Sequence, residues 1–356
     1  MNKDWSEKNK QMQSLIGRET TFAKGIEVLI DLRNDLFSQI SYIVNTFPGE
    51  AFYQMPFAGA DGYHSKTLAY SMWHIFRIED IVAHTLISGD DQVLFSGGWQ
   101  KKIGSPIITT GNELKGKEIA EFSEKLNVKE LYCYCEAVME SSNELLRSLT
   151  YADLKRCFSE EDKEMVKDSH CVSTDEDAIW LVDYWCEKDI RGLIKMPFSR
   201  HWIMHIEAMC RIKDRLCQIA RKGVDPIARC GLSCNHCFLK DWCGGCRTAY
   251  NTCSEAMNNS EKVCLNTSCC MEKQFDGCYE CGQIVDCRKG FYGYDDVNAV
   301  KAMALFARKY GKKELLKTMD RLRKEYEFEK IQEVLGNDLE EGLKILERHM
   351  NLGTIR

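Results

Sequence analysis

Twelve of the 19 cysteines crowd into one stretch of the chain, between Cys230 and Cys287. The segment RCGLSCNHCFLKDWCGGCR carries two C-x-x-C pairs separated by five residues, and GCYECGQ carries a third pair. A C-x-x-C turn directs two thiolates at one cation, and four such sulfurs are common ligands of tetrahedral zinc. The spacing therefore predicts structural zinc, which also suits a region with too few apolar residues to fold unaided.

Other uses of these thiols stay open. An iron–sulfur cluster or a redox-active dithiol would use the same residues, although the C-x-x-C-x-x-C spacing of the common bacterial cluster is absent. Twelve thiolates fill at most three four-ligand sites, and we favour two, because Cys269 and Cys270 are adjacent and Cys253 stands alone in a polar loop. His236 lies inside the first C-x-x-C pair, where an intervening residue usually points away from the metal.

Three of the eight histidines stand where helical spacing could bring them together. His201 and His205 are four residues apart in RHWIMHIEAMCRIKD, so both rings project from one face of a helix. The same stripe continues through apolar residues, and a metal would satisfy ring nitrogens that burial removes from water. On an earlier helix, His64, His74 and His84 are ten residues apart, which rotates each by about 80° from the last. We expect only His74, among apolar neighbours, to point inwards.

A plainer interpretation is that these histidines are hydrogen-bonded residues of the core or the surface. Glu79 and Asp80 could orient a ligand histidine, but we favour a solvated face that they share with Arg77. A three-imidazole site would leave coordination positions open, the arrangement in which a metal activates water or a thiolate. Zinc and nickel are the favoured metals, although iron and manganese also accept such ligands.

Helical periodicity dominates both parts of the chain, and few strand alternations occur. We expect helices over residues 20–47, 65–87, 114–126, 128–149 and 176–194, and another from Ser199, a potential N-cap, to residue 221. The pattern returns over residues 297–310, 314–335 and 339–349. The prediction is an all-α fold with a helical bundle over residues 1–224 and a cysteine-rich domain with C-terminal helices over residues 225–356, because the composition changes after Asp225-Pro226.

The composition is that of a folded chain: 44% of the 356 residues are hydrophobic and 29% are charged. The polar start MNKDWSEKNK and the lack of an apolar run of about 18 residues predict neither export nor a membrane span, so we expect a cytoplasmic, bacterial-type protein with reduced thiols. The formal net charge is −6, and residues 226–356 hold 20 Lys and Arg against 19 Asp and Glu. Neither part predicts a basic surface for nucleic acid.

The motifs WHIFRIED and HWIMHIEAM resemble those of the DinB-like superfamily of metal-binding four-helix bundles, which includes thiol-dependent transferases and isomerases. The resemblance spans about residues 20–220. It implies that His74, His201 and His205 bind a divalent metal, and that a low-molecular-weight thiol such as bacillithiol or mycothiol takes part. Added segments near residues 97–126 and 157–183 depart from short family members and could reshape the substrate entrance.

The cysteine-rich stretch resembles a family of domains that open with C-G-L-x-C-x-x-C, continue with C-x-G-C-R and end in a C-x-x-C pair followed by a lone cysteine. The resemblance covers about residues 228–330 and implies zinc binding. Where that family closes on F-P-C, this chain has Val285-Asp286-Cys287. The pattern selects ten ligands: Cys230, Cys234, Cys237, Cys243, Cys246, Cys264, Cys269, Cys278, Cys281 and Cys287.

Three functions stay open at this point. In the first, the bundle metal activates a thiol or water for transfer, isomerisation or hydrolysis of a small molecule. In the second, both metal centres are structural and the cysteine-rich domain binds a protein or nucleic-acid partner. In the third, that domain senses metal or oxidant. Trp242, Arg247 and Tyr250 are too few to form a nucleic-acid surface. Neither the substrate nor the oligomeric state follows from the sequence.

Overall fold

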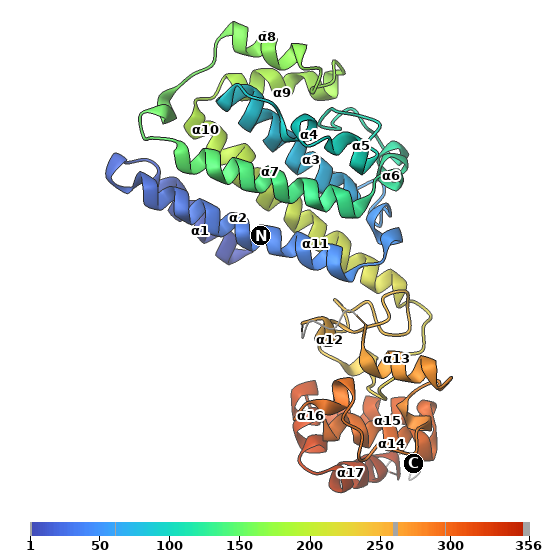
Figure 1. The fold of residues 1–356 in the computed structure, drawn as a ribbon. Coiled ribbons are helices and arrows are strands. Elements are labelled where there is room, and N and C mark those ends of the chain that lie inside the picture. Colours follow the sequence, from blue (N-terminus) through green and yellow to red (C-terminus); the bar gives the residue numbers. More distant parts are fainter. Residues whose placement is uncertain (1, 61, 259–262, 296, 352–356) are drawn as a thin grey trace. The chain divides into compact units, whose positions relative to one another are not determined.

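The structure, a computed structural model, describes residues 2–60, 62–258, 263–295 and 297–351. Within these ranges the chain is mostly helical, and an isolated antiparallel bridge joins Ile227 and Ser233. The all-α class expected from the sequence is therefore confirmed (Figure 1). The chain divides into two compact units, residues 1–213 and 214–356, so the division falls inside helix α11 (His201–Ala220). The boundary predicted from the sequence, after residue 224, lies beyond the end of that helix.

The first unit consists of helices and the loops that join them. The α-helices of its described residues are α1 (Lys3–Leu15), α2 (Phe22–Thr46), α3 (Leu68–Asp80), α4 (Val93–Ser96), α5 (Trp99–Ile103), α6 (Lys117–Glu124), α7 (Val128–Ser148), α8 (Glu160–Asp168), α9 (Glu176–Cys186), α10 (Ile190–Lys195) and α11. The longest of them, α2, α7 and α11, lie where the apolar periodicity predicts long helices. In α2, the stripe that includes Ile26, Leu29 and Leu36 is buried, which explains why the periodicity is visible in the sequence.

Three local features differ from the expected helices. Helix α1 is not among the helices expected from the sequence, because only Trp5 and Met12 of this polar segment are buried. The helix expected over residues 176–194 is two helices, α9 and α10, and Asp189 caps the second by accepting the N–H of Gly192 at 2.8 Å. Ser199 does not cap α11. It lies in a π-helical segment, Met196–Arg200, and its hydroxyl donates to a backbone carbonyl of α10 at 2.9 Å.

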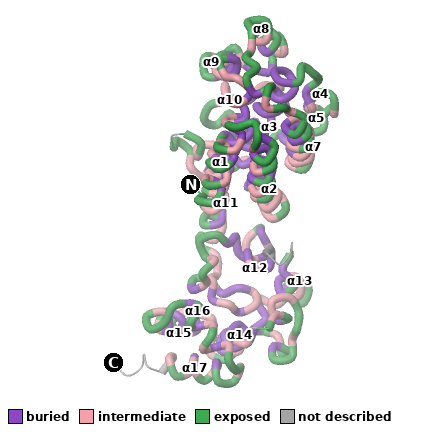
Figure 2. Tube along the Cα trace, turned by 90° about the vertical axis from the view of Figure 1, so that its left-hand side faces the viewer, coloured by how far each residue is buried: buried purple, intermediate pink, exposed green. Residues whose placement is uncertain are grey.

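Helix α3 is buried on every side, as the purple tube in Figure 2 shows. All of its residues are buried, and Thr67 caps its first turn by accepting the N–H of Tyr70 at 3.0 Å. The helix continues directly into a π-helical segment, Ile81–Ser88. A helix that is buried all round belongs to the core of its domain. His74, in the middle of α3, is therefore held inside the first unit.

A buried ion pair connects α3 to three other helices. Arg33 of α2 donates to the two carboxylate oxygens of Glu79 at 2.8 and 2.6 Å, and both side chains are fully buried. Trp202 of α11 donates its indole N–H to the same carboxylate at 2.7 Å. Ser142 of α7 also donates to it. One carboxylate thus joins α2, α3, α7 and α11, which fixes α11 next to α3.

Arg77 and Asp80 form a second buried pair, with 2.8 Å between Nη1 and Oδ2. The solvated face expected for Arg77, Glu79 and Asp80 is therefore wrong, because all three side chains are buried. Two segments from elsewhere in the sequence cover them. Arg77 donates to the carbonyl of Ile108 at 2.8 and 3.1 Å, and the Tyr134 hydroxyl of α7 donates to Asp80 at 2.8 Å.

The second unit combines cysteine-bearing loops with a helical core. Its described helices beyond α11 are α12 (Ser254–Asn258), α13 (Leu265–Glu272), α14 (Asn298–Tyr310), α15 (Lys312–Glu325), α16 (Phe328–Gly336) and α17 (Leu339–Asn351). The last four pack around Met303, Phe306, Leu315 and Leu346, so this unit has an apolar core of its own. Among the described residues, no helix has the length and apolarity needed to cross a membrane.

Candidate metal centre

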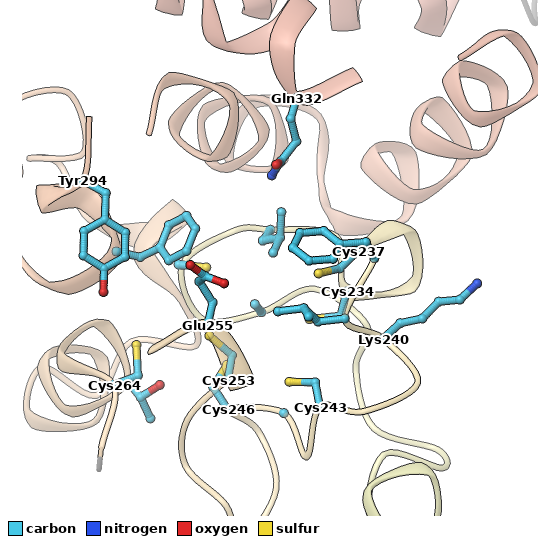
Figure 3. Close-up of a pocket in the computed structure, with 18 of the residues that line it drawn as sticks. Cys234, Cys237, Lys240, Cys243, Cys246, Cys253, Glu255, Cys264, Tyr294 and Gln332 are labelled. Atoms are coloured by element: carbon cyan, nitrogen blue, oxygen red, sulfur yellow. The ribbon is translucent and has the colours of Figure 1, made fainter. Parts of the chain in front are cut away.

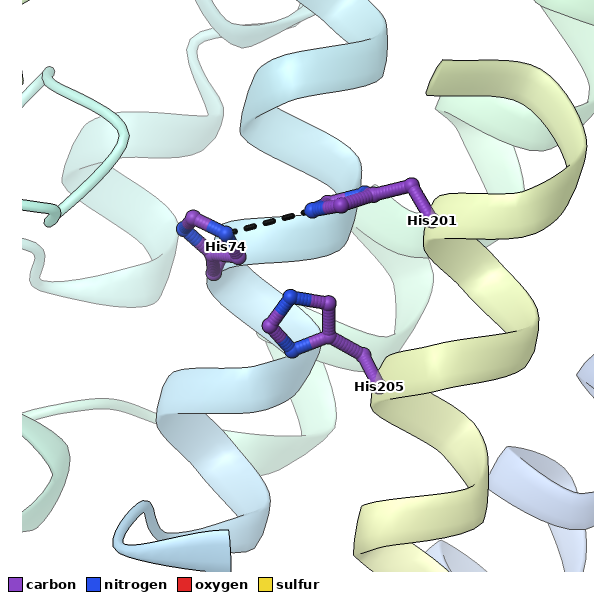
Figure 4. Close-up of side chains that lie close together, drawn as sticks. All are labelled: His74, His201 and His205. Atoms are coloured by element: carbon purple, nitrogen blue, oxygen red, sulfur yellow. Dashed lines mark hydrogen bonds between the residues drawn. The ribbon is translucent and has the colours of Figure 1, made fainter. Parts of the chain in front are cut away.

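Three histidines from two helices meet inside the first unit, as Figure 4 shows. His74 comes from α3, and His201 and His205 come from the first two turns of α11. All three are buried, and within the described ranges they alone form a group of three His, Cys, Asp or Glu residues whose ligand atoms lie within 4.8 Å of one another. The Nε2 atoms of His74 and His201 are 3.2 Å apart. The structure thus brings together the three histidines that the sequence singled out.

A backbone carbonyl determines where His74 carries its proton. Nδ1 of His74 lies 2.9 Å from the carbonyl oxygen of Thr110, which can only accept a hydrogen bond, so Nδ1 must donate. Nε2 is then a lone-pair nitrogen that faces His201. Metal-binding histidines usually donate their other ring N–H in this way. His74 is therefore held in the tautomer that a metal ligand requires.

The other two histidines have ring nitrogens without partners. Nδ1 of His201 and both ring nitrogens of His205 are buried and accept or donate no hydrogen bond within the described part of the chain. Burial lowers the pKa of His74 to about 4. Burial, followed by the neighbouring imidazoles, lowers the pKa of His201 and His205 well below the ordinary histidine value. All three rings are neutral near pH 7, which is the form that binds metal.

This donor set fits a divalent metal. Tetrahedral zinc–imidazole bonds of about 2.0–2.1 Å place the ligand nitrogens about 3.3–3.4 Å apart, close to the separation of the His74 and His201 Nε2 atoms. Three neutral imidazoles suit zinc or nickel and are also accepted by iron or manganese. A metal bound by the Nε2 atoms of His74 and His201 would also supply a partner for one of the two unpartnered ring nitrogens of His205, and an unpartnered buried nitrogen is costly.

A cavity of about 270 Å³ adjoins the three imidazoles. Its other walls are mainly aromatic and aliphatic side chains: Tyr63, Ile78, Trp180, Leu181, Tyr184, Trp185, Met196 and Pro197. Asn112 is polar, and no Asp, Glu, Lys or Arg is among the described lining residues. Tyr63 packs its ring on His205 with centroids 4.7 Å apart. Because Tyr63 and Trp180 are exposed, the cavity communicates with solvent.

The two other histidines near this helix have different partners. His84 places Nδ1 2.7 Å from the carboxylate of Asp90 and Nε2 3.1 Å from the hydroxyl of Ser141. His64 lies with Nε2 3.3 Å from the guanidinium of Arg211. As the ten-residue spacing predicts, only one of these histidines faces the site.

The cysteines of the second unit line two separate cavities. The first cavity, of about 500 Å³, is drawn in Figure 3, and its cysteines are Cys230, Cys234, Cys237, Cys243, Cys246, Cys253 and Cys264. The second cavity, of about 390 Å³, has the cysteines Cys269, Cys270, Cys278, Cys281 and Cys287. All ten cysteines selected by the sequence pattern line one cavity or the other, as do Cys253 and Cys270, which the pattern leaves out. No three sulfurs in the described chain lie within 4.8 Å of one another.

Two of the three C-x-x-C pairs are closed by a backbone hydrogen bond between their cysteines. The N–H of Cys237 donates to the carbonyl of Cys234 at 3.2 Å, and that of Cys281 donates to the carbonyl of Cys278 at 2.9 Å. The sulfurs of Cys270 and Cys278 are 3.7 Å apart. Two thiolates on one tetrahedral zinc, with bonds of about 2.3 Å, are separated by about 3.8 Å. The second cavity therefore contains one sulfur pair already at the spacing of a zinc site.

Sequence patterns do not reveal three features of these sites. Thr110 acts through its backbone carbonyl, so its side-chain type carries no signal. Spacing alone cannot choose between Cys270 and its neighbour Cys269. His236 lies inside the first C-x-x-C pair, and its Nε2 atom is 3.0 Å from the carboxylate of Asp320. His236 is not among the residues that line the first cysteine cavity.

The histidine site combines a metal-binding donor set with a cavity of the size of a small molecule. Three imidazoles fill three of the four positions of tetrahedral zinc, which leaves at least one for another ligand. Activation of a molecule bound at that position is what such an arrangement can do chemically. No family model and no curated protein matches the sequence, so no relative specifies that molecule.

Proposed function

We propose that the chain is a metal-dependent enzyme in which His74, His201 and His205 hold a divalent ion, zinc or nickel, inside a DinB-like bundle. When bound, the metal would activate a small thiol or water for transfer, isomerisation or hydrolysis of a small molecule. The observation that carries this proposal is that three neutral imidazoles line a cavity to which the described chain brings no fourth His, Cys, Asp or Glu ligand. A purely structural zinc site usually has four protein ligands.

Two contacts around the site would keep the ligands in place. The Thr110 carbonyl orients His74 through the 2.9 Å hydrogen bond to Nδ1. Trp202, the neighbour of His201, anchors the start of α11 to Glu79 at 2.7 Å. Loss of such supporting contacts typically lowers metal affinity or activity by about 10–100-fold. The ligand histidines are therefore supported by contacts from α3 and from the loop that carries Thr110.

The cavity favours a substrate that is small and largely apolar. Its volume of about 270 Å³ is slightly below the roughly 300–1,000 Å³ of typical ligand pockets. Trp180, Tyr184 and Trp185 offer aromatic surface, and the described lining contains no carboxylate or cationic side chain to bind a charged group. A thiol fits as the second reactant, because soft thiolates bind these divalent metals well.

Cobalt substitution of the full-length protein tests this function. Cobalt in the cysteine-rich unit should absorb equally in the unchanged chain and in His205→Ala, so the difference spectrum isolates the cobalt of the histidine site. Addition of azide or a small thiol should change that difference spectrum, because the incoming ligand takes an open position.

A difference spectrum that is indifferent to every small ligand, with the intensity of four protein donors, would contradict the proposal. The metal would then be a structural element, and an interaction role for the chain would be favoured. A clear response directs the search for a substrate to thiol cofactors first.

A further inference from the structure

One carboxamide lies among the apolar walls of the cavity beside the three histidines. It belongs to Asn112, and no other Asn or Gln is among the described residues that line this cavity. Apart from the imidazoles, the other walls are aromatic and aliphatic. Pockets of this kind use a few well-placed polar groups to orient a ligand and to select it. What Asn112 presents to the cavity, a donor or an acceptor, therefore bears on what binds there.

The hydroxyl of Thr110 determines which end of this carboxamide is available. It donates to Oδ1 of Asn112 at 2.8 Å, so the protein itself engages the carbonyl end of the amide. Nδ2 of Asn112 donates to no residue in the described part of the chain, and it is not among the buried nitrogens without a partner. The accessible end of the amide is therefore its pair of N–H donors.

The same threonine connects this amide to a candidate metal ligand. Thr110 is fully buried, and its carbonyl oxygen lies 2.9 Å from Nδ1 of His74. One residue thus orients His74 through its backbone and Asn112 through its hydroxyl. Groups that buried contacts hold in this way lose little freedom when a ligand binds. The N–H donors of Asn112 are therefore pre-organised together with the imidazole of His74.

The charge of the lining and its aromatic polar groups agree with a preference for acceptors. Trp180 already donates its indole N–H to the carbonyl of Asp177 at 2.9 Å. The hydroxyls of Tyr63 and Tyr184 can donate or accept, so they exclude neither kind of ligand. Among the described lining residues no carboxylate attracts a cation, and no Lys or Arg attracts an anion. The lining therefore suits a neutral molecule that carries an acceptor.

We propose that the substrate is a neutral carbonyl compound, an ester, amide or ketone, whose oxygen accepts an N–H of Asn112. This inference rests on the proposed metal-dependent function, because Asn112 and the three histidines line the same cavity. A carbonyl oxygen replaces water as the acceptor of the amide N–H. An apolar group at the same place leaves that N–H unpaired, which weakens binding. Asn112 therefore selects carbonyl compounds over apolar molecules of the same shape.

Two thiols of similar size test this selection in the cobalt-substituted full chain. Methyl thioglycolate carries an ester carbonyl, and isopentanethiol has as many heavy atoms but no oxygen. The spectrum of the cobalt at the histidine site, obtained by subtraction of the His205→Ala spectrum, reports the affinity for each thiol. The two thiols differ in acidity, so the quantity to compare between variants is the ratio of their affinities.

Asn112→Leu should lower this ratio by about tenfold, because leucine has a similar branched shape but no N–H donor. Asn112→Asp should lower the ratio as well, since its carboxylate still accepts the Thr110 hydroxyl but has no N–H to offer. Asn45→Leu is the matched control. Asn45 is exposed on α2 and is not among the lining residues, so the ratio should stay unchanged.

Thr110→Val separates the orientation of the amide from its presence. Valine has the shape of threonine without the hydroxyl, and the backbone carbonyl that holds His74 is retained. The variant should therefore keep its metal and show a lower affinity ratio, because the amide of Asn112 is no longer fixed. A role of Thr110 in packing alone would leave the ratio unchanged.

An unchanged ratio in Asn112→Leu would overturn this inference and leave the metal-dependent function in place, because both thiols would still bind. If Asn112→Leu does not fold, the ratio in Asn112→Asp decides, since that variant keeps the size of the side chain. A cobalt spectrum of the unchanged chain that responds to neither thiol would instead overturn the metal-dependent function, and this inference with it.

Discussion

At the scale of single residues, two adjacent cysteines occupy different surroundings in the second cavity. Cys270 is buried, and its sulfur lies 3.7 Å from that of Cys278. Cys269 lines the same cavity but is only half-buried. The hydrogen bond from the Cys270 thiol is the largest factor that lowers the pKa of Cys278 to about 7, so Cys278 ionises more readily than an ordinary cysteine.

We therefore expect Cys270→Ser to remove the zinc of the second cavity and Cys269→Ser to retain it. The physical reason is distance, since a zinc ion on Cys278 reaches the sulfur of Cys270 with little rearrangement. Zinc per chain, measured by elemental analysis on the two matched variants, checks this. The opposite order would show that the family pattern, which selects Cys269, identifies the ligand better than the sulfur positions do.

Residue types and spacing indicated which histidines come together. They did not indicate which other residues surround them. His201 and His205 share a helix face because four residues make about one turn. What completes the site comes from a distant segment, through the carbonyl of Thr110. The same limit explains the error at Glu79 and Asp80. Their spacing places Glu79 and Asp80 near each other on one helix, but it does not indicate that other segments of the chain cover them.

At the scale of helices, the buried pair of Arg33 and Glu79 is the polar connection among α2, α3, α7 and α11. Glu79→Ala would leave the guanidinium of Arg33 buried without its counter-charge. Removal of one partner of a buried ion pair typically costs about 3–5 kcal/mol. We expect the free energy of unfolding of the first unit to fall by about this amount. Denaturant unfolding followed by tryptophan fluorescence measures it, because only Trp242 lies outside that unit.

Glu121→Ala is the matched control for this prediction. Glu121 is exposed and lies 3.7 Å from Lys117 on the surface of α6, so its loss should change stability by no more than about 1 kcal/mol. The double variant Arg33→Met/Glu79→Leu removes both buried charges and should recover much of the lost stability. Equal, small effects of Glu79→Ala and Glu121→Ala would contradict the role assigned to the buried pair.

Helix positions were predictable where one apolar stripe is long, and breaks between short helices were not. The stretch over residues 314–335 has continuous periodicity, yet it forms α15 and α16, because Tyr326 adopts an extended conformation with φ −134°. Asp189 is a residue type typical of helix N-caps, but the apolar periodicity on both sides of it predicts one continuous helix. Local propensity determines such breaks only together with the tertiary contacts of each helix.

At the scale of the whole chain, two units offer two kinds of metal ligand. The first unit has three buried imidazoles, and the second has two cavities lined by cysteines. The all-α class follows from periodicity, and the candidate ligands follow from spacing together with the resemblances to the two families. The reaction does not, because the cavity beside the histidines is assembled from residues between Tyr63 and His205 that lie far apart in the sequence.

The central claim is that the three histidines bind a metal of their own, and elemental analysis of His205→Ala tests it most directly. The matched control is His170→Asn, which changes an exposed histidine with a positive φ of 54° that asparagine tolerates. Protein produced without added metal should lose one divalent ion per chain in His205→Ala, keep its cysteine-bound zinc and be unchanged in His170→Asn. An unaltered metal content in His205→Ala would contradict the claim.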